Sequence, residues 1–236
     1  NVIMNNKGDV DYSDTSITQN TRVSYPIHFI DNIQPNSIGN TPKNIFFLTA
    51  DAFGVLPPIS KLTPGQAAYH FISGYTAKVA GTEAGVTEPV PIFSACFGAP
   101  FMPLHPTKYA EMLSAKMKAT GVNVWLVNTG WTGGPYGIGT RMKLSFTRAM
   151  INAAMDGSLE AANKDNYHIH SVFGVLQPRV CPNVPIEFLS PRKTWKNDVG
   201  FYKTAYKLAQ SFQTNFQQFE AYANEEIMDG GPKSSF

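Results

Sequence analysis

Three short apolar runs along the chain have the length and composition of buried strands. They cover residues 44–49, 122–127 and 92–97, and each is rich in valine, isoleucine, phenylalanine or tryptophan. Near-continuous apolar runs of this length are typical of strands that are covered on both faces, as in an α/β sheet. We therefore expect a domain of the α/β class.

Helix signals lie between these runs. Thr63, Pro64 and Gln66 stand where an N-cap, a first helical residue and a capping-box partner would stand. That helix is expected to end at Gly74, and a second is expected between Pro106 and Gly121, because glycine is favoured just past a helix C-terminus. His105, which precedes the second helix, is interpreted as a cap or turn residue.

A long amphipathic helix is predicted over residues 199–223. Its apolar positions recur every three or four residues, which puts them on one face; they are Phe201, Ala205, Leu208, Phe212, Phe216 and Phe219. We interpret this face as core packing, with a contact in a homo-oligomer as the alternative. The preceding segment, 176–195, contains four prolines and is expected to be irregular.

Composition and charge narrow the function classes. The 236 residues, 43% of them hydrophobic, suffice for one large α/β domain or two small ones. A net charge of +2 with scattered basic residues argues against a nucleic-acid partner. No apolar run approaches the roughly 20 residues that cross a bilayer, so we expect no membrane partner. Cys96 and Cys181 are interpreted as buried free thiols, which indicates a cytoplasmic location.

The first residues suggest a hairpin rather than a free terminus. Residues 2–12 carry two short strand signals around Asn5, Asn6, Lys7 and Gly8, without an initiator methionine before them, so we expect a fragment of a longer protein. The aspartates at 9, 11 and 14 resemble part of a calcium loop. The glycine and glutamate of that pattern are missing, so we interpret them as turn residues.

The glycine-rich loop at residues 128–141 is the first candidate for binding chemistry. It follows the run at 122–127, contains five glycines and ends at Arg141, with Lys143 close behind. Glycine lets backbone N–H groups approach an anion or a flat ring, and the two cations could pair with phosphate. We expect a mobile loop that wraps a phosphorylated nucleotide, with a long surface crossover as the alternative.

Other polar residues have a functional and a structural interpretation. Arg22 is either a surface residue or a clamp for carboxylate or phosphate. Asp51, after the run at 44–49, could line a ligand site, but capping the turn toward Pro57 is preferred. The sequence His168-Ile169-His170 resembles half of a zinc site, yet no third ligand can be nominated, so a solvated strand face is preferred.

Residues 75–89 form a polar stretch with glycines at 81 and 85 that could serve as hinges. An ordinary surface loop is one interpretation. A lid that excludes water from a neighbouring nucleotide site is the other.

Several long blocks together resemble the ATP-dependent phosphoenolpyruvate carboxykinases. They include NTRVSYP at 20–26, LTADAFGVLPPISKLTPGQ at 48–66, LVNTGWTGG at 126–134 and GTRMKLSFTRAM at 139–150, in the family's order. The resemblance implies a mixed-sheet mononucleotide-binding C-terminal domain with a mobile lid loop. It also implies the gluconeogenic conversion of oxaloacetate and ATP to phosphoenolpyruvate, carbon dioxide and ADP, with Mg²⁺ on the nucleotide and Mn²⁺ at the reaction centre.

The resemblance also implies roles for individual residues. Arg22 corresponds to the catalytic arginine that contacts the substrate and the ATP phosphates, and Arg141, Met142 and Thr147 fall on nucleotide-binding positions. The lid would comprise residues 75–89, with Tyr75, Lys78, Gly81, Thr82, Glu83 and Gly85 among its members.

The family's phosphate-binding loop and metal ligands do not occur in this sequence. They would belong to an N-terminal half of the same enzyme, so residues 1–236 alone should be inactive. The alternatives are a P-loop kinase acting on another small acid and a non-catalytic nucleotide-binding module.

Overall fold

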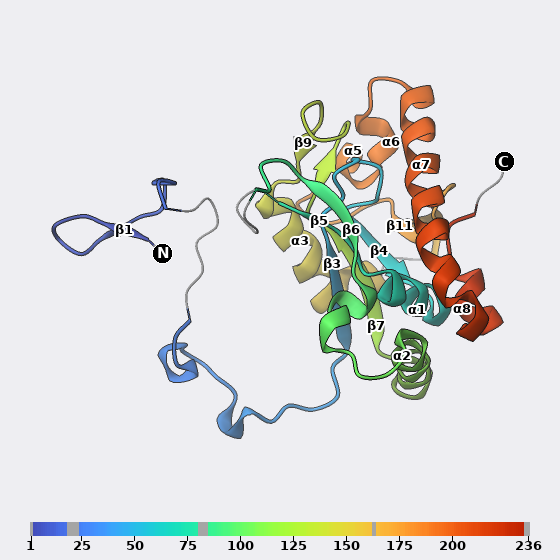
Figure 1. Ribbon diagram of the computed structural model, residues 1–236, viewed down its shortest axis with the longest axis horizontal. Coiled ribbons are helices and arrows are strands. Elements are labelled where there is room, and N and C mark those ends of the chain that lie inside the picture. Colours follow the sequence, from blue (N-terminus) through green and yellow to red (C-terminus); the bar gives the residue numbers. More distant parts are fainter. Residues whose placement is uncertain (1, 18–23, 80–84, 162–163, 234–236) are drawn as a thin grey trace. The chain divides into compact units, whose positions relative to one another are not determined.

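The structure is a computed structural model that describes residues 2–17, 24–79, 85–161 and 164–233. The chain divides into two units, one formed by residues 1–42 and 78–90 and the other by residues 43–77 and 91–236 (Figure 1). The second unit contains nearly all of the regular structure.

The first unit contains the expected hairpin. Strands β1 (Ile3–Met4) and β2 (Val10–Asp11) pair antiparallel around a turn in which Gly8 has a φ of +86°. Two short 3-10 helices follow, η1 (Ile27–Phe29) and η2 (Pro35–Ser37). The hairpin prediction is confirmed.

The aspartates of this unit are turn residues, as expected. The Asp11 carboxylate accepts a hydrogen bond from the Ser13 amide at 2.9 Å, and the Asp14 carboxylate accepts one from the Ser16 amide at 2.8 Å. In the parts of the chain that the structure describes, no three His, Cys, Asp or Glu side chains are grouped to hold a metal ion.

A mixed five-stranded sheet forms the centre of the second unit. Its strand order is β10 (Tyr167–Ile169), β11 (Leu176–Pro178), β4 (Ile59–Leu62), β7 (Asn123–Asn128) and β3 (Asn44–Thr49). Only the β3–β7 pair is parallel, and the other three pairs are antiparallel. The predicted strands at 44–49 and 122–127 and the α/β class are confirmed.

Strand β3 differs from its prediction in one respect. It is the last strand of the sheet, and the Leu48 side chain is 57% exposed. The expectation of a strand covered on both faces is therefore wrong for β3 in this chain, because no described strand or helix covers Leu48.

The third apolar run is only partly a strand. It begins within β6 (Val90–Phe93), which pairs with β5 (Tyr75–Lys78) in a separate two-stranded sheet. The chain then turns into the 3-10 helix η3 (Ala95–Phe97), closed by a hydrogen bond of 2.8 Å from the Phe97 amide to the Ser94 carbonyl. The turn prevents the run from continuing as the strand that its apolar residues predict.

Helices cover both faces of the five-stranded sheet. On one face, α1 (Pro64–Ser73), α2 (Pro106–Thr120) and α7 (Asp198–Phe216) pack with Phe47, Val124 and Leu126. On the other face, Trp125 and Val127 pack with Met150 and Ala153 of α3 (Leu144–Met155). The remaining elements are short: η4 (Ala99–Phe101), β8 (Trp131–Thr132), β9 (Thr140–Arg141), α4 (Ser158–Ala161), η5 (Lys164–Asn166), α5 (Ile186–Leu189), α6 (Pro191–Thr194), η6 (Gln217–Tyr222) and α8 (Glu225–Asp229).

The helix ends follow the sequence signals closely. The Thr63 hydroxyl accepts from the Gln66 amide and the Gln66 side chain accepts from the Thr63 amide, which completes the capping box, and Gly74 ends α1 with a φ of +52°. Helix α7 is shorter than predicted. It ends at Phe216 and continues as the 3-10 turn η6, which keeps Phe219 buried.

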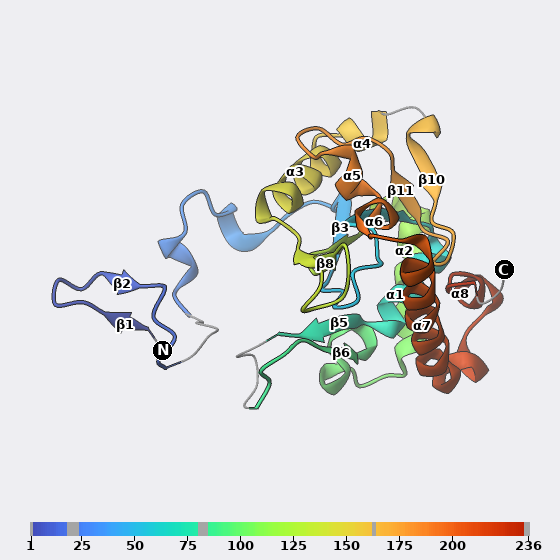
Figure 2. The ribbon, with the colours of Figure 1, turned by 90° about the horizontal axis from the view of Figure 1, so that it is seen from above.

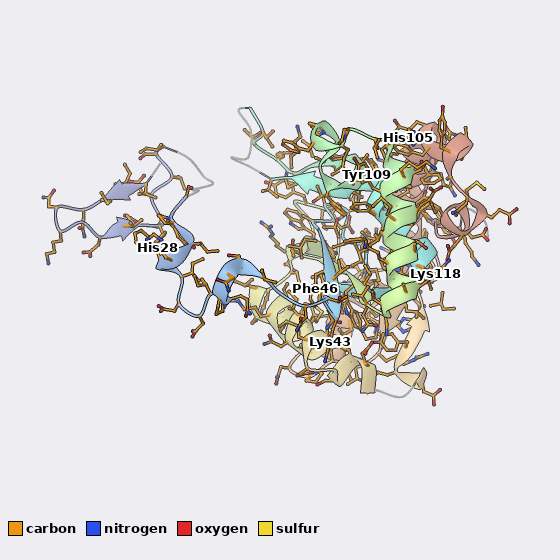
Figure 3. The ribbon with its side chains drawn as sticks, turned by 90° about the horizontal axis from the view of Figure 1, so that it is seen from below. His28, Lys43, Phe46, His105, Tyr109 and Lys118 are labelled. Atoms are coloured by element: carbon orange, nitrogen blue, oxygen red, sulfur yellow. The ribbon has the colours of Figure 1, made fainter. Side chains whose placement is uncertain are left out.

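His105 is the N-cap residue of α2, as predicted, and lies at the opposite end of that helix from Lys118 (Figure 3). Its ring is hydrogen-bonded to the Thr107 hydroxyl at 2.8 Å, and its centroid lies 4.4 Å from that of Tyr222. The His105 ring thus joins the start of α2 to η6.

Both cysteines are buried and free, as predicted, and burial raises the pKa of each thiol to about 11. Within the described residues, no helix is long and apolar enough to cross a membrane.

The histidines at 168–170 do not form a solvated strand face. Strand β10 ends at Ile169, which is 68% exposed, and His170, directly after the strand, is 5% exposed. The expectation is wrong because His170 is buried and the Nδ1 of His168 is shielded from solvent. Burial lowers the pKa of His170 to about 4, and it lowers the pKa of His70 in α1 to the same value.

These two histidines should make the protein acid-sensitive. Each binds its proton less readily when folded, at about 4 against an ordinary 6.5, so the stability they confer is complete above pH 6.5 and is lost as pH falls toward 4. A loss of roughly 3 kcal/mol per histidine corresponds to such a shift. Urea unfolding between pH 4 and 7 should show this loss.

His70→Phe should remove about half of the acid dependence, since phenylalanine suits the aromatic surroundings and cannot charge. His28→Gln, at an exposed position, is the matched control and should leave the dependence intact. An unchanged pH profile in His70→Phe would contradict the assignment.

Candidate functional site

The Asp51 carboxylate organises the loop that leaves β3. It is fully buried and accepts hydrogen bonds from the amides of Phe53, Val55 and Leu56 at 2.9, 2.7 and 2.9 Å. The Tyr75 hydroxyl donates a fourth at 3.0 Å. Burial raises the pKa of Asp51, while these four donors oppose the rise. The preferred interpretation of Asp51 as a turn-capping residue is confirmed.

Asn128 joins this loop to the one that leaves β7. Thr49 and Asn128 are paired in register, so the two parallel strands end side by side. The Asn128 side-chain oxygen accepts from the amides of Asp51 and Gly130 at 3.0 and 2.8 Å, and its amide nitrogen donates to the Leu56 carbonyl at 3.1 Å. One side chain therefore fixes the start of both loops.

The glycines of the loop at 128–141 allow backbone to pack on backbone. A Cβ at Gly130 would collide with the backbone of Asp51, and one at Gly54 would collide with the Gly134 carbonyl. Hydrogen bonds reinforce this packing, from the Trp131 amide to the Asp51 carbonyl at 2.8 Å and from the Tyr136 amide to the Ala52 carbonyl at 2.9 Å. The structure thus gives Gly130 and Gly54 a packing role, whereas the sequence analysis interpreted the loop glycines, Gly130 among them, as contacts for a ligand.

Arg141 lies on β9, where it pairs in register with Trp131 of β8. Its Nε donates to the Thr129 carbonyl at 3.2 Å, and its guanidinium carbon lies 5.5 Å from the centroid of the Trp131 ring. Both contacts fix the base of the side chain. The residue itself is exposed, so its charge remains available to a ligand.

Met142 and Thr147 follow Arg141 in the chain, at the junction between β9 and α3. The Met142 amide donates to the Gly130 carbonyl at 2.7 Å, and its side chain is 8% exposed. Thr147 lies in the first turn of α3, also buried, with its amide bonded to the Lys143 carbonyl at 3.2 Å. The structure therefore brings Arg141, Met142 and Thr147 together where the glycine-rich loop enters α3.

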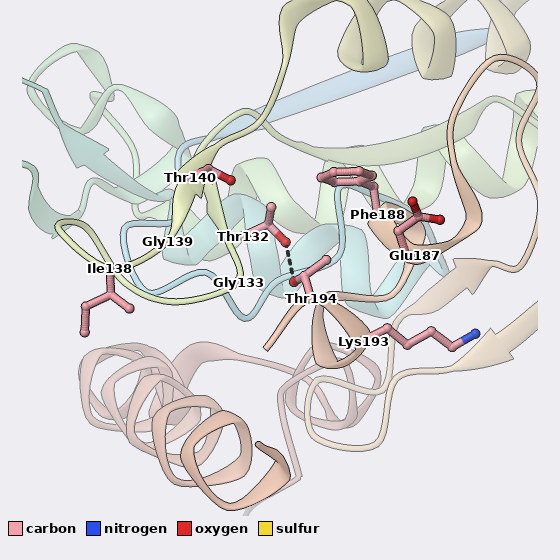
Figure 4. Close-up of a pocket in the computed structure, with 9 residues that line it drawn as sticks. All are labelled: Thr132, Gly133, Ile138, Gly139, Thr140, Glu187, Phe188, Lys193 and Thr194. Atoms are coloured by element: carbon pink, nitrogen blue, oxygen red, sulfur yellow. Dashed lines mark hydrogen bonds between the residues drawn. The ribbon is translucent and has the colours of Figure 1, made fainter. Parts of the chain in front are cut away.

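A cavity of about 370 Å³ adjoins the same loop (Figure 4). The loop forms one wall and residues 187–194 form the other, linked by a hydrogen bond of 2.8 Å between the hydroxyls of Thr132 and Thr194. The volume is within the range of small-molecule sites. The lining residues are Thr132, Gly133, Ile138, Gly139, Thr140, Glu187, Phe188, Lys193 and Thr194.

Sequence reasoning missed the second wall of this cavity. Glu187, Phe188 and Lys193 stand in the proline-rich segment that is expected to be irregular, and no motif marks them. The signal available in the sequence was that a carboxylate, an aromatic ring and a cation stand within seven residues of one another. Arg141, Met142 and Thr147 are not among the lining residues, although Arg141 is adjacent to Thr140.

The other predicted site residues lie elsewhere or outside the described part of the chain. Arg22, Gly81, Thr82 and Glu83 lie outside the described residues. Lys78 is the last residue of β5, and Gly85 has a φ of +83°. Their proposed roles in catalysis and in a lid stay predictions.

Tyr75, which the lid prediction included, is a core residue. It is 3% exposed, and its ring centroid lies 5.3 Å from that of Phe93 and 5.1 Å from that of Phe212. The structure therefore places Tyr75 beneath Asp51 as a fixed support.

Fold and site together define an α/β protein with a mixed sheet, whose candidate site adjoins the carboxyl ends of its two parallel strands. The sequence model of the phosphoenolpyruvate carboxykinase family matches residues 1–187, and the chain belongs to this family.

Curated relatives from three bacteria support the same assignment, and each is named phosphoenolpyruvate carboxykinase (ATP). The chain is 69% identical to that of Christiangramia forsetii over 98% of its length, 70% identical to that of Flavobacterium johnsoniae over 95%, and 56% identical to that of Geotalea uraniireducens over 92%. It covers 43%, 41% and 41% of these relatives, so it spans about two-fifths of their length. The predicted family is confirmed.

Replacing Asp51 should lower the free energy of unfolding of the protein. Asp51→Ala leaves the buried amides of Val55 and Leu56 and the part-buried amide of Phe53 without acceptors, and each unsatisfied buried group costs on the order of 1–3 kcal/mol. We expect the free energy of unfolding, measured in urea, to fall by at least about 3 kcal/mol. Asp156→Ala removes an exposed turn carboxylate and serves as the control. Equal effects of the two substitutions would contradict the role given to Asp51.

Proposed function

We propose that this chain is the nucleotide-binding part of an ATP-dependent phosphoenolpyruvate carboxykinase, which converts oxaloacetate and ATP to phosphoenolpyruvate, carbon dioxide and ADP. The observation that carries the proposal is the grouping of Arg141, Met142 and Thr147 at the junction of the loop and α3. The family membership and the names of the relatives support the reaction.

The three residues offer complementary contacts to a nucleotide. Within the described part of the chain, the Nε of Arg141 donates a hydrogen bond, whereas the terminal N–H groups of its guanidinium have no partner. These terminal groups can therefore bind phosphate oxygens. Met142 offers a polarizable thioether, which packs well on a flat aromatic ring such as adenine. Thr147 adds a hydroxyl in the first turn of α3, five residues after Met142 in the chain.

Phosphoryl transfer depends on charge neutralisation more than on covalent chemistry. In our proposal Arg22 neutralises charge on the transferring phosphoryl group and contacts oxaloacetate. Residues 75–89, apart from the fixed Tyr75, close over the site and protect the enolate intermediate from water. A divalent metal assists, with Mg²⁺ on ATP and Mn²⁺ at the reaction centre, held by ligands outside residues 1–236.

The rest of the enzyme is the partner that this proposal requires. It supplies the phosphate-binding loop and the metal ligands, for which this sequence has no motif. The position of β3 supports such a partner, because β3 is the last strand of the sheet within the described residues and a parallel strand is usually flanked by further structure. The 57% exposed side chain of Leu48 is a second apolar surface that a partner could cover. We place the enzyme in the cytoplasm.

Two arginine substitutions in the full-length enzyme separate the proposed roles. Arg141→Ala should raise the KM for ATP roughly tenfold and leave kcat within about threefold, because it removes binding common to the ground and transition states. Arg22→Gln should lower kcat by about 10²–10³, as loss of one contact to transition-state charge does.

Arg148→Ala, at an exposed position on α3, is the matched control and should leave both constants unchanged. Equal losses in kcat and KM for both test variants would contradict this division. Absence of ATP-dependent phosphoenolpyruvate formation in the wild-type enzyme would overturn the proposed function itself.

A further inference from the structure

A second cavity, of about 180 Å³, is lined by residues of β10, β11, α6 and the start of α7; Figure 2 shows how these elements are arranged. It shares no lining residue with the cavity at the glycine-rich loop. Its lining contains hydroxyls, imidazoles, an amide and a guanidinium but no carboxylate: His168, Ile169, His170, Ser171, Gln177, Ser190, Pro191, Arg192, Phe201 and Tyr202.

Strand register explains why these polar groups converge. His168 pairs with Gln177 across the antiparallel β10–β11 ladder, so their side chains share one face. Ile169, between the two histidines, is 68% exposed. The β10–β11 pair thus presents His168 and Gln177 to the cavity, and His170, directly after β10, is the third hydrogen-bonding side chain in the lining.

Two of these three side chains are already engaged. The Nδ1 of His170 accepts from the amides of Val172 and Phe173 at 3.2 and 3.3 Å, and the Gln177 side chain donates to the Leu189 carbonyl at 2.7 Å. His170 therefore cannot offer Nδ1 to a metal. His168 is different, because its Nδ1 is shielded from solvent and has no hydrogen-bond partner among the described residues.

The charges around His168 are mostly positive. Arg192 is held by Asp198 through two contacts, Nε to Oδ1 at 3.1 Å and Nη2 to Oδ2 at 3.0 Å, which fixes its guanidinium at the cavity. Burial is the main cause that lowers the pKa of His168, and the positive charges of Arg179 and Lys193 lower it further. Asp198 is the one carboxylate among these charged residues, and it is paired with Arg192. An excess of positive charge therefore remains, which a negative ligand would reduce.

We propose that this cavity binds a small dianion, of the phosphate type or the short dicarboxylate type, through Arg192 and the imidazole of His168. The volume corresponds to about six water molecules, which leaves room for either kind of ligand. Ser171, Ser190 and Tyr202 complete the lining with hydroxyl groups. The site is separate from the nucleotide site, and the proposal does not rest on the carboxykinase reaction.

Binding to this cavity should strengthen as pH falls. A bound dianion favours the imidazolium form of His168, so the protein takes up a proton on binding. The titratable and charged groups around this ring are Arg179 after β11, Arg192 and Lys193 on α6, Asp198 and Tyr202 on α7, and His170 directly after β10. Of these, His170 stays neutral above pH 5 because its pKa is about 4.

The test is an NMR titration of the histidine ring signals in the full-length protein, with His168 assigned by comparison with His168→Gln. Sodium sulfate is the first probe, because its charge is constant between pH 6 and 8, and disodium malonate is the second. Ionic strength is held constant with sodium chloride. We expect a saturable shift of the His168 signal and an affinity for sulfate that is several-fold higher at pH 6 than at pH 8.

Variants make the test specific. Arg192→Gln should weaken binding at least about tenfold, and Arg192→Lys should restore part of it, since a charged hydrogen bond contributes that much. His168→Gln, followed by calorimetry, should abolish the pH dependence. Lys203→Gln removes a nearby exposed charge on α7 that does not line the cavity, and it should change the affinity less than about twofold.

Tighter binding of sulfate than of malonate would assign the site to phosphate-type ligands, and the reverse would assign it to dicarboxylates. A His168 signal that neither anion shifts, or that sodium chloride alone shifts equally, would overturn the proposal. So would unchanged affinity in Arg192→Gln, provided that its melting temperature matches that of the wild type. Phosphoenolpyruvate formation is measured separately, so failure of one proposal is distinguishable from failure of the other.

Discussion

The buried carboxylate of Asp51 holds the other parts of the candidate site in position. By accepting from three backbone amides and from Tyr75, it sets the path of the chain after β3. The glycine-rich loop then packs backbone to backbone against that path, and β9 places Arg141 at its end. The Asp51 carboxylate thereby determines where the Arg141 guanidinium lies, although it acts through the intervening backbone and not through direct contact with Arg141.

Local signals predicted the local structure well. The strands at 44–49 and 122–127 and the capping box at Thr63 follow from side-chain periodicity and turn chemistry, which act over a few residues. The family resemblance covered nearly the whole chain and pointed to Arg141, Met142 and Thr147, which lie where the glycine-rich loop enters α3. Their role in nucleotide binding stays a prediction.

The structural features that the sequence did not predict depend on tertiary packing. Two glycines of the site serve contacts with backbone about 80 residues away, and nothing near them in sequence indicates this. His170, directly after β10, is buried, and its ring centroid lies 6.1 Å from that of Phe201 on α7. The lining residues Glu187 and Lys193 stand in an irregular segment, where periodicity gives no information.

These contacts imply that the protein positions the loop at 128–141 before a nucleotide arrives. Hydrogen exchange of the Trp131, Tyr136 and Met142 amides, measured in the full-length protein with and without ATP, is the decisive measurement. We predict slow exchange without ATP and rates that change less than about threefold when ATP is added. Rapid exchange of all three amides without ATP, and protection only in its presence, would contradict a loop that is positioned in advance.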